Sequence, residues 1–429
     1  MFSMRLYGSI LRLCSQTVHT KCYQASMLQT RCISDVSKPI LSIEQVRSHL
    51  RKVVGASKSY SDTIPDRSGL KSHLVDDQTK LAPRKMSDSF QTVCIPLSDK
   101  SIREKYINIH GSVRFGQLLE NLDTFAVLIS YQHNSPLLTN TGISPLSIVT
   151  AMVDEIKIHH DLIDPTVDII MTGHVMWTGK SSLEIGMWLK QEDKSVLDAE
   201  FVMVARDPES KKAAVIHPLE TTNEEERKLF EAGNQHKQKR LAEANTSLFQ
   251  NPPTLEERQI VHEIFLKTLD PRSKSFRSRV LPEGSVWMES TRLKNAVVCF
   301  PEKRNIHNKV FGGYLMRKAF ELAWANACVF SGNRPYVVAV DDILFHCPVP
   351  IGSLLLMSSQ VSYSDGKKFI ARVHAEVMDT LQGTSTTSNV FHFTFTCGDH
   401  PVPAVVPMTY GESMLYLDGL RRSKKGRML

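Results

Sequence analysis

Paired cysteines, an unbroken apolar run and a basic face are all missing from this sequence, and each absence excludes a class of protein. The 8 cysteines include no CxxC pair, which argues against a disulfide framework and against a zinc knuckle. The most apolar stretch, residues 311–330, is interrupted by Arg317, Lys318 and Glu321, so no membrane-spanning helix is predicted. The net charge of +7 is concentrated at the two ends of the chain. The nearly neutral interior offers no surface for a nucleic-acid backbone, and a nucleic-acid partner is not expected.

The first 34 residues resemble a targeting segment. They are rich in Arg, Ser, Thr and Leu and contain no Asp or Glu, the composition of a mitochondrial transit peptide. A secretory signal needs an unbroken apolar core, which Arg5 and Arg12 interrupt, and the run that ends at Ser34 resembles a matrix-processing site with cleavage after Ile33. The alternative is a basic, disordered start. We expect a protein of the mitochondrial matrix.

The rest of the chain is organised by an internal repeat. At 41% apolar and 23% charged residues, its composition is that of an ordinary globular protein. The segment that begins Asn108-Ile-His-Gly-Ser-Val returns as Asn305-Ile-His-Asn-Lys-Val, which indicates one structural unit used twice. Each copy leads into a helix that is apolar over most of its surface and then into four strand-like runs. Such a helix must be buried, so we expect an α+β fold in which each copy is a long helix enclosed by a curved antiparallel sheet.

The expected parts of the chain follow from this repeat. They are a targeting segment at 1–34, an extension at 35–85, a first domain at 86–220, a helical linker at 221–280, a second domain at 281–400 and a tail at 401–429. The strands that follow the first helix are expected at 147–158, 168–177, 182–189 and 196–204. In the second copy we expect a strand at 286–298, a helix at 310–330, and strands at 335–345, 353–363, 368–377 and 390–396.

The two copies differ at one polar position of the buried helix. Ten residues after the shared Val, the first copy has Asp123 and the second has Phe320. Taken alone, an Asp on a helix is usually a solvated residue, and an Asn before Gly-Gly usually forms a turn. A duplicated unit whose polar groups are divided between its halves suggests instead a site built across them.

The loop from Asn305 to Gly313, which reads Asn-Ile-His-Asn-Lys-Val-Phe-Gly-Gly, resembles the loop that enters the helix of acyl-CoA thioesterases. Further runs are similar to a mitochondrial group of these enzymes, among them 113–116, 144–150, 201–207, 315–324, 334–338 and 409–419. The resemblance spans most of residues 86–420. It implies a tandem (double) hotdog fold, hydrolysis of acyl-CoA, and assembly into a homo-oligomer, a trimer of double hotdogs.

The resemblance also implies a catalytic Asn from one hotdog unit and a catalytic Asp from the other. Matched position by position, these are Asn305 and Asp123. The reciprocal pair, Asn108 with Phe320, lacks the acid, so we expect one competent and one degenerate site in each chain. The chain departs from the family pattern at Phe311, where a His is usual.

Thioester hydrolysis needs an activated water and a donor for the oxyanion. Asp123, with apolar neighbours on its helix, suits activation of water, and direct attack by its carboxylate to form a mixed anhydride is equally compatible with the residues. Asn305 is expected to hold the water or the substrate. A backbone N–H of Gly312 or Gly313, at a helix start, is expected to face the thioester oxygen.

Coenzyme A calls for a few basic groups at the rim of the site. The candidates lie in or beside two equivalent turns: Lys180, Arg206, Lys367 and Lys368. Each is a weak candidate because turn lysines are mostly solvated. No His, Asp and Glu residues share a metal-ligand spacing, so neither a metal nor a cofactor other than the coenzyme A of the substrate is predicted.

Two other functions remain open. Hydratases of the same fold use an Asp and a His close together, and this chain has no Asp-x-x-x-x-His run near Asn305. An acyl-CoA sensor that binds without hydrolysis is also compatible with the fold, because a fold alone does not decide function. Tight acyl-CoA binding without release of coenzyme A would identify the sensor.

Overall fold

The computed structural model of the chain describes residues 40–56, 67–159, 163–273, 275–305, 309–380 and 382–427. The targeting segment predicted at 1–34 lies outside these ranges. Residues from Leu41 onward form one compact unit. Among the described helices, none is both long and apolar enough to cross a bilayer.

The two copies of the repeat fold into the same series of elements. The first contains β3 (Gln91–Ile95), α5 (Phe115–His133), β4 (Ser147–Ile158), β5 (Ile169–Thr178), β6 (Ser182–Gln191) and β7 (Lys194–Arg206). The second contains β10 (Leu293–Val298), α8 (Gly312–Ser331), β11 (Tyr336–Phe345), β12 (Leu354–Ser364), β13 (Lys368–Asp379) and β14 (Thr384–Thr396). The predicted order of one buried helix followed by four strands is therefore confirmed in both halves.

The elements outside the repeat are short strands and surface helices. Before the first copy come β1 (Leu41–Ser42), α2 (Ile43–Val54), β2 (Arg84–Lys85) and α3 (Met86–Ser89), and α4 (Lys100–Arg103) follows β3. Between the copies lie β8 (Leu219–Glu220), α6 (Glu224–Asn245), α7 (Leu255–Lys267) and β9 (Ser285–Trp287). The chain continues after β14 with β15 (Ala404–Val406) and α9 (Tyr410–Arg427).

All major strands belong to one eleven-stranded sheet, in the order β1-β3-β5-β6-β7-β4-β11-β14-β13-β12-β10. The halves join where β4 pairs antiparallel with β11, which places Val153 opposite Ile343 and Ile156 opposite Val340. Val153 and Ile156 correspond in the repeat to Val340 and Ile343, so exchanging the halves reproduces the same pairs. The join is thus a local two-fold axis, and the chain has the α+β double hotdog fold.

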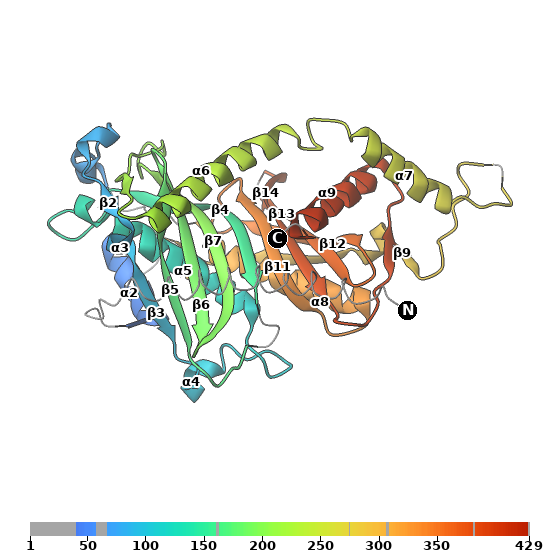
Figure 1. Cartoon of the computed structure of the whole chain (residues 1–429), viewed down its shortest axis with the longest axis horizontal. Helices are drawn as coiled ribbons and strands as arrows, with labels where there is room; N and C mark the ends of the chain where they lie inside the picture. Colours follow the sequence, from blue (N-terminus) through green and yellow to red (C-terminus); the bar gives the residue numbers. More distant parts are fainter. Residues whose placement is uncertain are drawn as a thin grey trace, which may run out of the picture. The chain divides into compact units, whose positions relative to one another are not determined.

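One face of the sheet holds the two buried helices, α5 and α8, which pack against each other (Figure 1). Helix α5 has no solvated face along most of its length, because nearly every position from Phe115 to Tyr131 is buried. The same two-fold relation holds here. Gly313 of α8 approaches Glu120 of α5, and its counterpart Gly116 of α5 approaches Arg317 of α8.

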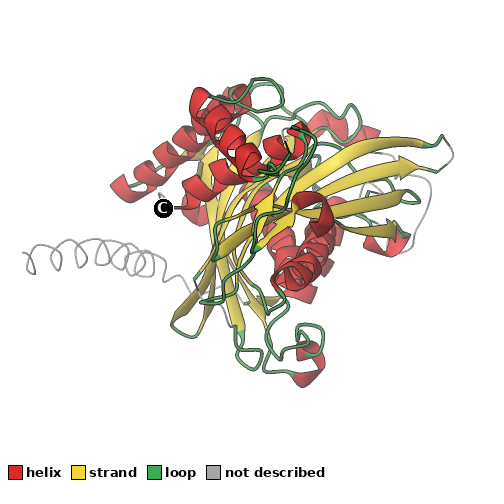
Figure 2. Cartoon of the chain, turned by 90° about the vertical axis from the view of Figure 1, so that its right-hand side faces the viewer, coloured by secondary structure: helices red, strands yellow, loops and turns green. Residues whose placement is uncertain are grey.

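The opposite face of the sheet is covered by α6 and α9, so helices lie on both sides of it (Figure 2). Glycines allow this close packing: Gly233 of α6 lies against Trp177 of β5, and Gly419 of α9 lies against Tyr363 of β12. The segments predicted as a helical linker and a tail therefore each contribute a helix packed on the sheet. The domain boundaries drawn at 86–220 and 281–400 remain predictions.

One expected strand is wrong in its extent. Residues 286–298 are not a single strand, because β9 ends at Trp287 and a 3₁₀ turn covers Met288–Thr291 before β10 begins. Side-chain hydroxyls explain the break. Ser290 donates to the carbonyl of Trp287, and Thr291 donates to the carbonyl of Met288 at 2.7 Å, bonds that compete with a strand ladder.

Candidate active site

The carboxylate of Asp123 is held between the two halves of the protein. Asp123 lies on α5 and is 1% exposed. One of its oxygens accepts a hydrogen bond from the backbone N–H of Gly313 at 2.6 Å, and the other accepts one from the hydroxyl of Thr150. Gly313 belongs to the start of α8 and Thr150 to β4, so the first half supplies the acid and the second half supplies one of its donors.

Burial raises the pKa of Asp123 to about 6. The hydrogen bonds from Thr150 and Gly313 favour the ionised form and oppose this rise, while the charge of Glu120 adds to it. A carboxyl with this pKa is ionised near neutral pH and is more basic than an ordinary aspartate. Those are the properties that a general base needs.

Asn305 makes before α8 the same two hydrogen bonds that Asn108 makes before α5. Its backbone N–H donates to the carbonyl of Lys309 at 2.6 Å, and its side-chain oxygen accepts from the Lys309 N–H at 3.1 Å. Asn108 makes the same two bonds with Ser112, at 2.8 Å and 3.1 Å. Both asparagines therefore shape the entrance to a buried helix through their side-chain oxygens, whatever chemistry their amide groups perform.

Gly312 and Gly313 let α8 begin directly against α5. A Cβ on Gly313 would lie 2.9 Å from Cα of Glu120 and 3.0 Å from Cβ of Asp123. A Cβ on Gly312 would lie 3.2 Å from a carboxylate oxygen of Asp123. The sequence predicted that an N–H of this pair faces the thioester oxygen. In the structure the Gly313 N–H donates to Asp123 instead, so Gly312 remains the candidate donor for the substrate.

The reciprocal position in the second half has lost its acid. The ring of Phe320 packs among the rings of Phe115, Phe393 and Phe395, at centroid distances of 5.0, 5.5 and 6.2 Å. Glu321, the next residue, bonds to Arg317 at 2.9 Å and to Lys318 at 3.0 Å. Although burial acts to raise it, these bonds lower the pKa of Glu321, so Glu321 does not replace the missing base.

The four basic candidates for coenzyme A lie at opposite ends of the sheet. The end of β7 at Arg206 pairs with the start of β4 at Ser147, and the Lys180 turn is joined to it by the bond from Ala205 N–H to Ser181. The turn that holds Lys367 and Lys368 lies instead beside the start of β11. Because β4 and β11 are antiparallel, only Lys180 and Arg206 lie at the end of β4 that carries Thr150.

Sequence reasoning did not assign a role to Thr150. The residue stands in one of the runs that resemble the thioesterases, but nothing in its spacing from Asp123 indicates that the two side chains meet. Only the packing of β4 across α5 brings them together. Lys211 and Lys309 form a second pair to which sequence reasoning assigned no role. Burial lowers the pKa of Lys309, and the positive charge of Lys211 lowers it further.

Replacing Thr150 by Val is expected to move the pH dependence of the reaction upward. Val keeps the shape of Thr but cannot donate, so the pKa of Asp123 should rise above about 6. Loss of a hydrogen bond to a charged group costs about 1.5–3 kcal/mol, or about 10- to 100-fold in kcat/KM. A profile of kcat/KM against pH measures both effects. Thr124→Val is the matched control, because Thr124 bonds only to the carbonyl of Glu120; an unshifted profile for Thr150→Val would contradict the assignment.

Known proteins are similar to this chain over most of its length. The chain is 50% identical to the human mitochondrial acyl-coenzyme A thioesterase 9 over 390 residues, which cover 89% of this chain and 88% of that protein. The chain belongs to the acyl-coenzyme A thioesterase family. The mouse mitochondrial acyl-coenzyme A thioesterase 10 is 48% identical, over 91% of this chain and 90% of its own. The hop chloroplastic acyl-coenzyme A thioesterase 2 is 32% identical, over 80% and 82%.

Membership of the acyl-coenzyme A thioesterases confirms the family predicted from the sequence and the prediction of an enzyme. No protein-family model matches the chain. Among solved structures it is similar to an acyl-CoA hydrolase of Staphylococcus aureus in complex with butyryl coenzyme A, with 24% identity and a TM-score of 0.32 over 34% of this chain and 93% of that one. It is also similar to an acyl-ACP thioesterase of Bacteroides thetaiotaomicron, with 11% identity and a TM-score of 0.43 over 72% and 99%.

Proposed function

We propose that this protein hydrolyses fatty acyl-CoA to a free fatty acid and coenzyme A in the mitochondrial matrix. The observation that carries the proposal is the buried carboxylate of Asp123, held between Thr150 of its own half and the first turn of α8 from the other half. The mitochondrial relatives and the acid-free segment 1–34 support the compartment. Microscopy of a full-length fluorescent fusion tests the compartment, and a cytosolic signal would contradict it.

In the proposed mechanism, Asp123 removes a proton from the water that attacks the thioester carbonyl. The two hydrogen bonds on its carboxylate fix the orientation of the base before substrate arrives. The Gly312 N–H and the positive end of the α8 dipole stabilise the oxyanion. The amide group of Asn305 orients the thioester or the water. As the carbonyl re-forms, the C–S bond breaks and the proton held by Asp123 passes to the departing thiolate, which releases coenzyme A and the fatty acid and restores the base.

Direct attack by Asp123 is the alternative route, because either carboxylate oxygen retains a second lone pair beside its hydrogen bond. If a mixed anhydride forms and water attacks it at the carboxyl carbon of Asp123, repeated turnover in ¹⁸O-labelled water puts label into the Asp123 carboxylate. Mass spectrometry of the peptide that contains Asp123 detects this label, which would establish the anhydride route. We expect no label.

Two asparagine variants test the division of the site between the halves. Asn305→Ala and Asn108→Ala each remove the side-chain oxygen that accepts from the N–H four residues later, so the loss of this bond is common to both variants. We expect Asn305→Ala to lose at least ~10-fold in turnover, the size of one lost oriented hydrogen bond, and Asn108→Ala to stay close to the wild type.

The assay for this pair is release of coenzyme A from acyl-CoAs of two to sixteen carbons. Equal losses in the two asparagine variants would contradict a split site. Tight binding of acyl-CoA by the wild type with no release of coenzyme A would indicate that the protein is an acyl-CoA sensor and not a hydrolase. Formation of a hydroxyacyl-CoA from an enoyl-CoA would indicate the hydratase. The trimer of double hotdogs stays a proposal, which the solution mass of the protein tests.

A further inference from the structure

A charged hollow lies on the outer face of the sheet, remote from Asp123, where the two halves join. It is formed by β4, β7 and β11 under helices α6 and α9, and includes Glu155, Asp341 and Arg422 in its wall. Its lining carries six carboxylates against three Lys or Arg side chains and one His. Junctions between domains are frequent ligand sites, and this excess of negative charge favours a cation.

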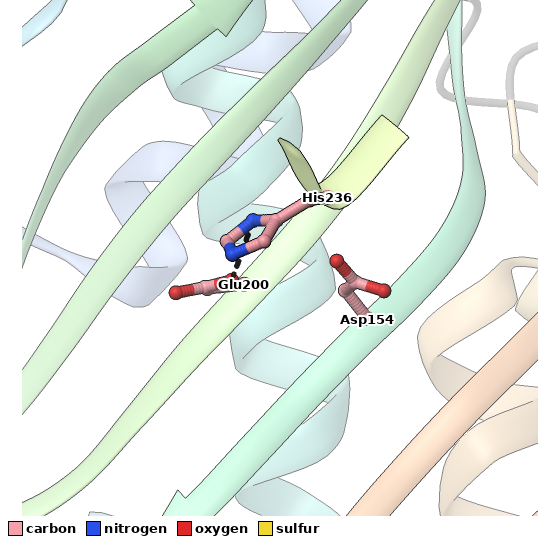
Figure 3. A group of neighbouring side chains, drawn as sticks. All are labelled: Asp154, Glu200 and His236. Atoms are coloured by element: carbon pink, nitrogen blue, oxygen red, sulfur yellow. Dashed lines mark ion pairs between the residues drawn. The ribbon is translucent and has the colours of Figure 1, made fainter. Parts of the chain in front are cut away.

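Three potential metal ligands converge inside the hollow (Figure 3). Asp154 comes from β4, Glu200 from β7 and His236 from α6, and one donor atom of each lies within 4.8 Å of the others. Nδ1 of His236 is 3.6 Å from a carboxylate oxygen of Glu200.

The close packing of α6 explains why His236 reaches the sheet. Gly233, one helical turn earlier, has no room for a Cβ, which would lie 2.5 Å from Cβ of Trp177. The Trp177 indole N–H also donates to Asn234 at 2.8 Å. With this turn fixed, the imidazole of His236 is directed at β6 and β7, where it contacts Glu184 at 2.8 Å.

The carboxylates in and beside the hollow differ in how closely a cationic side chain approaches them. Arg240 bonds to Asp154 at 2.7 Å and to Glu184 at 3.2 Å. The carboxylate of Glu200 has a more distant partner, because Nδ1 of His236 lies 3.6 Å from it but 2.8 Å from Glu184.

We propose that Asp154, Glu200 and His236 bind a divalent transition-metal ion, with Zn²⁺ as the best match. One imidazole nitrogen and two carboxylate oxygens form a donor set suited to zinc and poorly suited to Mg²⁺, which prefers oxygen ligands alone. The ion links α6 to β4 and β7. It thereby ties the segment between the halves to the strand that also carries Thr150, without any part in the hydrolysis itself.

Zinc binding by the full-length protein without a His tag tests the proposal after treatment with a chelator. Calorimetric titration should give one site for the wild type and for His400→Gln, an exposed control. His236→Gln, which keeps a hydrogen-bonding side chain opposite Glu184, should bind at least ~10-fold more weakly, since one of three ligands is lost. Zinc should raise the melting temperature of the wild type by roughly a few degrees and leave His236→Gln unchanged. Mg²⁺ should give no comparable effect in either.

A second variant, Glu200→Gln, keeps the test decisive if His236→Gln does not fold, because Gln removes the charge of a half-buried side chain without changing its shape. It should fold and bind zinc at least ~10-fold more weakly. Absence of zinc binding by the wild type would overturn the proposal. Binding of equal strength by the variants would also overturn it, since the zinc would then lie at cysteines or at other histidines.

Discussion

Asp123→Asn is expected to lower the rate of acyl-CoA hydrolysis on the order of 10³-fold, the usual contribution of a general base. Asn fits the site without rearrangement. Its oxygen accepts from the Gly313 N–H, and its amide donates to the hydroxyl oxygen of Thr150, which then acts as acceptor. The loss therefore reports the missing base and not a disturbed fold. Release of coenzyme A, followed with a thiol reagent, measures it.

The same variant should be more stable than the wild type at pH 8. The folded-state pKa of about 6 lies above the usual value of 3.8, so the folded protein binds this proton more tightly than the unfolded chain. The free energy of unfolding consequently falls as pH rises from about 4 to about 6. Removing the charge should therefore raise the free energy of unfolding by up to ~3 kcal/mol at pH 8 and by little at pH 4. Thermal melting at the two pH values measures this difference.

Glu321→Gln is the control for Asp123→Asn. Glu321 is a half-buried acid on α8, beside the position of the missing Asp, and it is paired with Arg114 and Arg317. We expect this variant to retain its turnover and to gain no stability at pH 8. Turnover in Asp123→Asn close to that of the wild type would remove Asp123 from the mechanism.

Gly313→Ala is expected to damage both the fold and the reaction. The new Cβ would lie 2.9 Å from the backbone of Glu120, and neither helix is able to yield locally because both are packed inside the sheet. Overpacking of this kind costs about 1–3 kcal/mol. It also displaces the N–H that donates to Asp123, so turnover should fall about 10- to 100-fold, as for loss of a hydrogen bond to a charged group.

Gly116→Ala is the symmetry-related control for this variant. Its Cβ would meet Cγ of Arg317 at 3.1 Å, the flexible part of a side chain, with the nearest backbone atom at 3.5 Å. We expect a smaller fall in melting temperature and turnover within a few-fold of the wild type. Equal inactivation by the two glycine variants would contradict the assignment of the active site to one side of the two-fold axis.

Much of the fold could be predicted from the sequence because the repeat shows itself locally. The periodicity of α5 and α8, the turn residues between strands and the recurrence of the Asn108 loop at Asn305 are all short-range signals. The asymmetry of Asp123 and Phe320 then indicated which half supplies the acid. These predictions needed only positions along the chain, not distances in space.

The remaining features depend on long-range packing. Thr150 meets Asp123 because β4 crosses α5, and the Gly313 N–H is taken by Asp123 because two helices approach at glycines. Neither contact leaves a pattern in the sequence. The docking of α6 on the outer face is of the same kind, since its charged composition predicts a helix but not the surface that the helix covers.

The pH dependence of kcat/KM for the wild-type protein tests the central claim most directly. Because Asp123 must be ionised to act, and burial raises its pKa to about 6, we expect kcat/KM to rise tenfold per pH unit below about pH 6 and to level off above it. The residual activity of Asp123→Asn should lack this step. A wild-type profile with no group titrating between pH 5 and 7, or a step that persists unchanged in Asp123→Asn, would contradict the account.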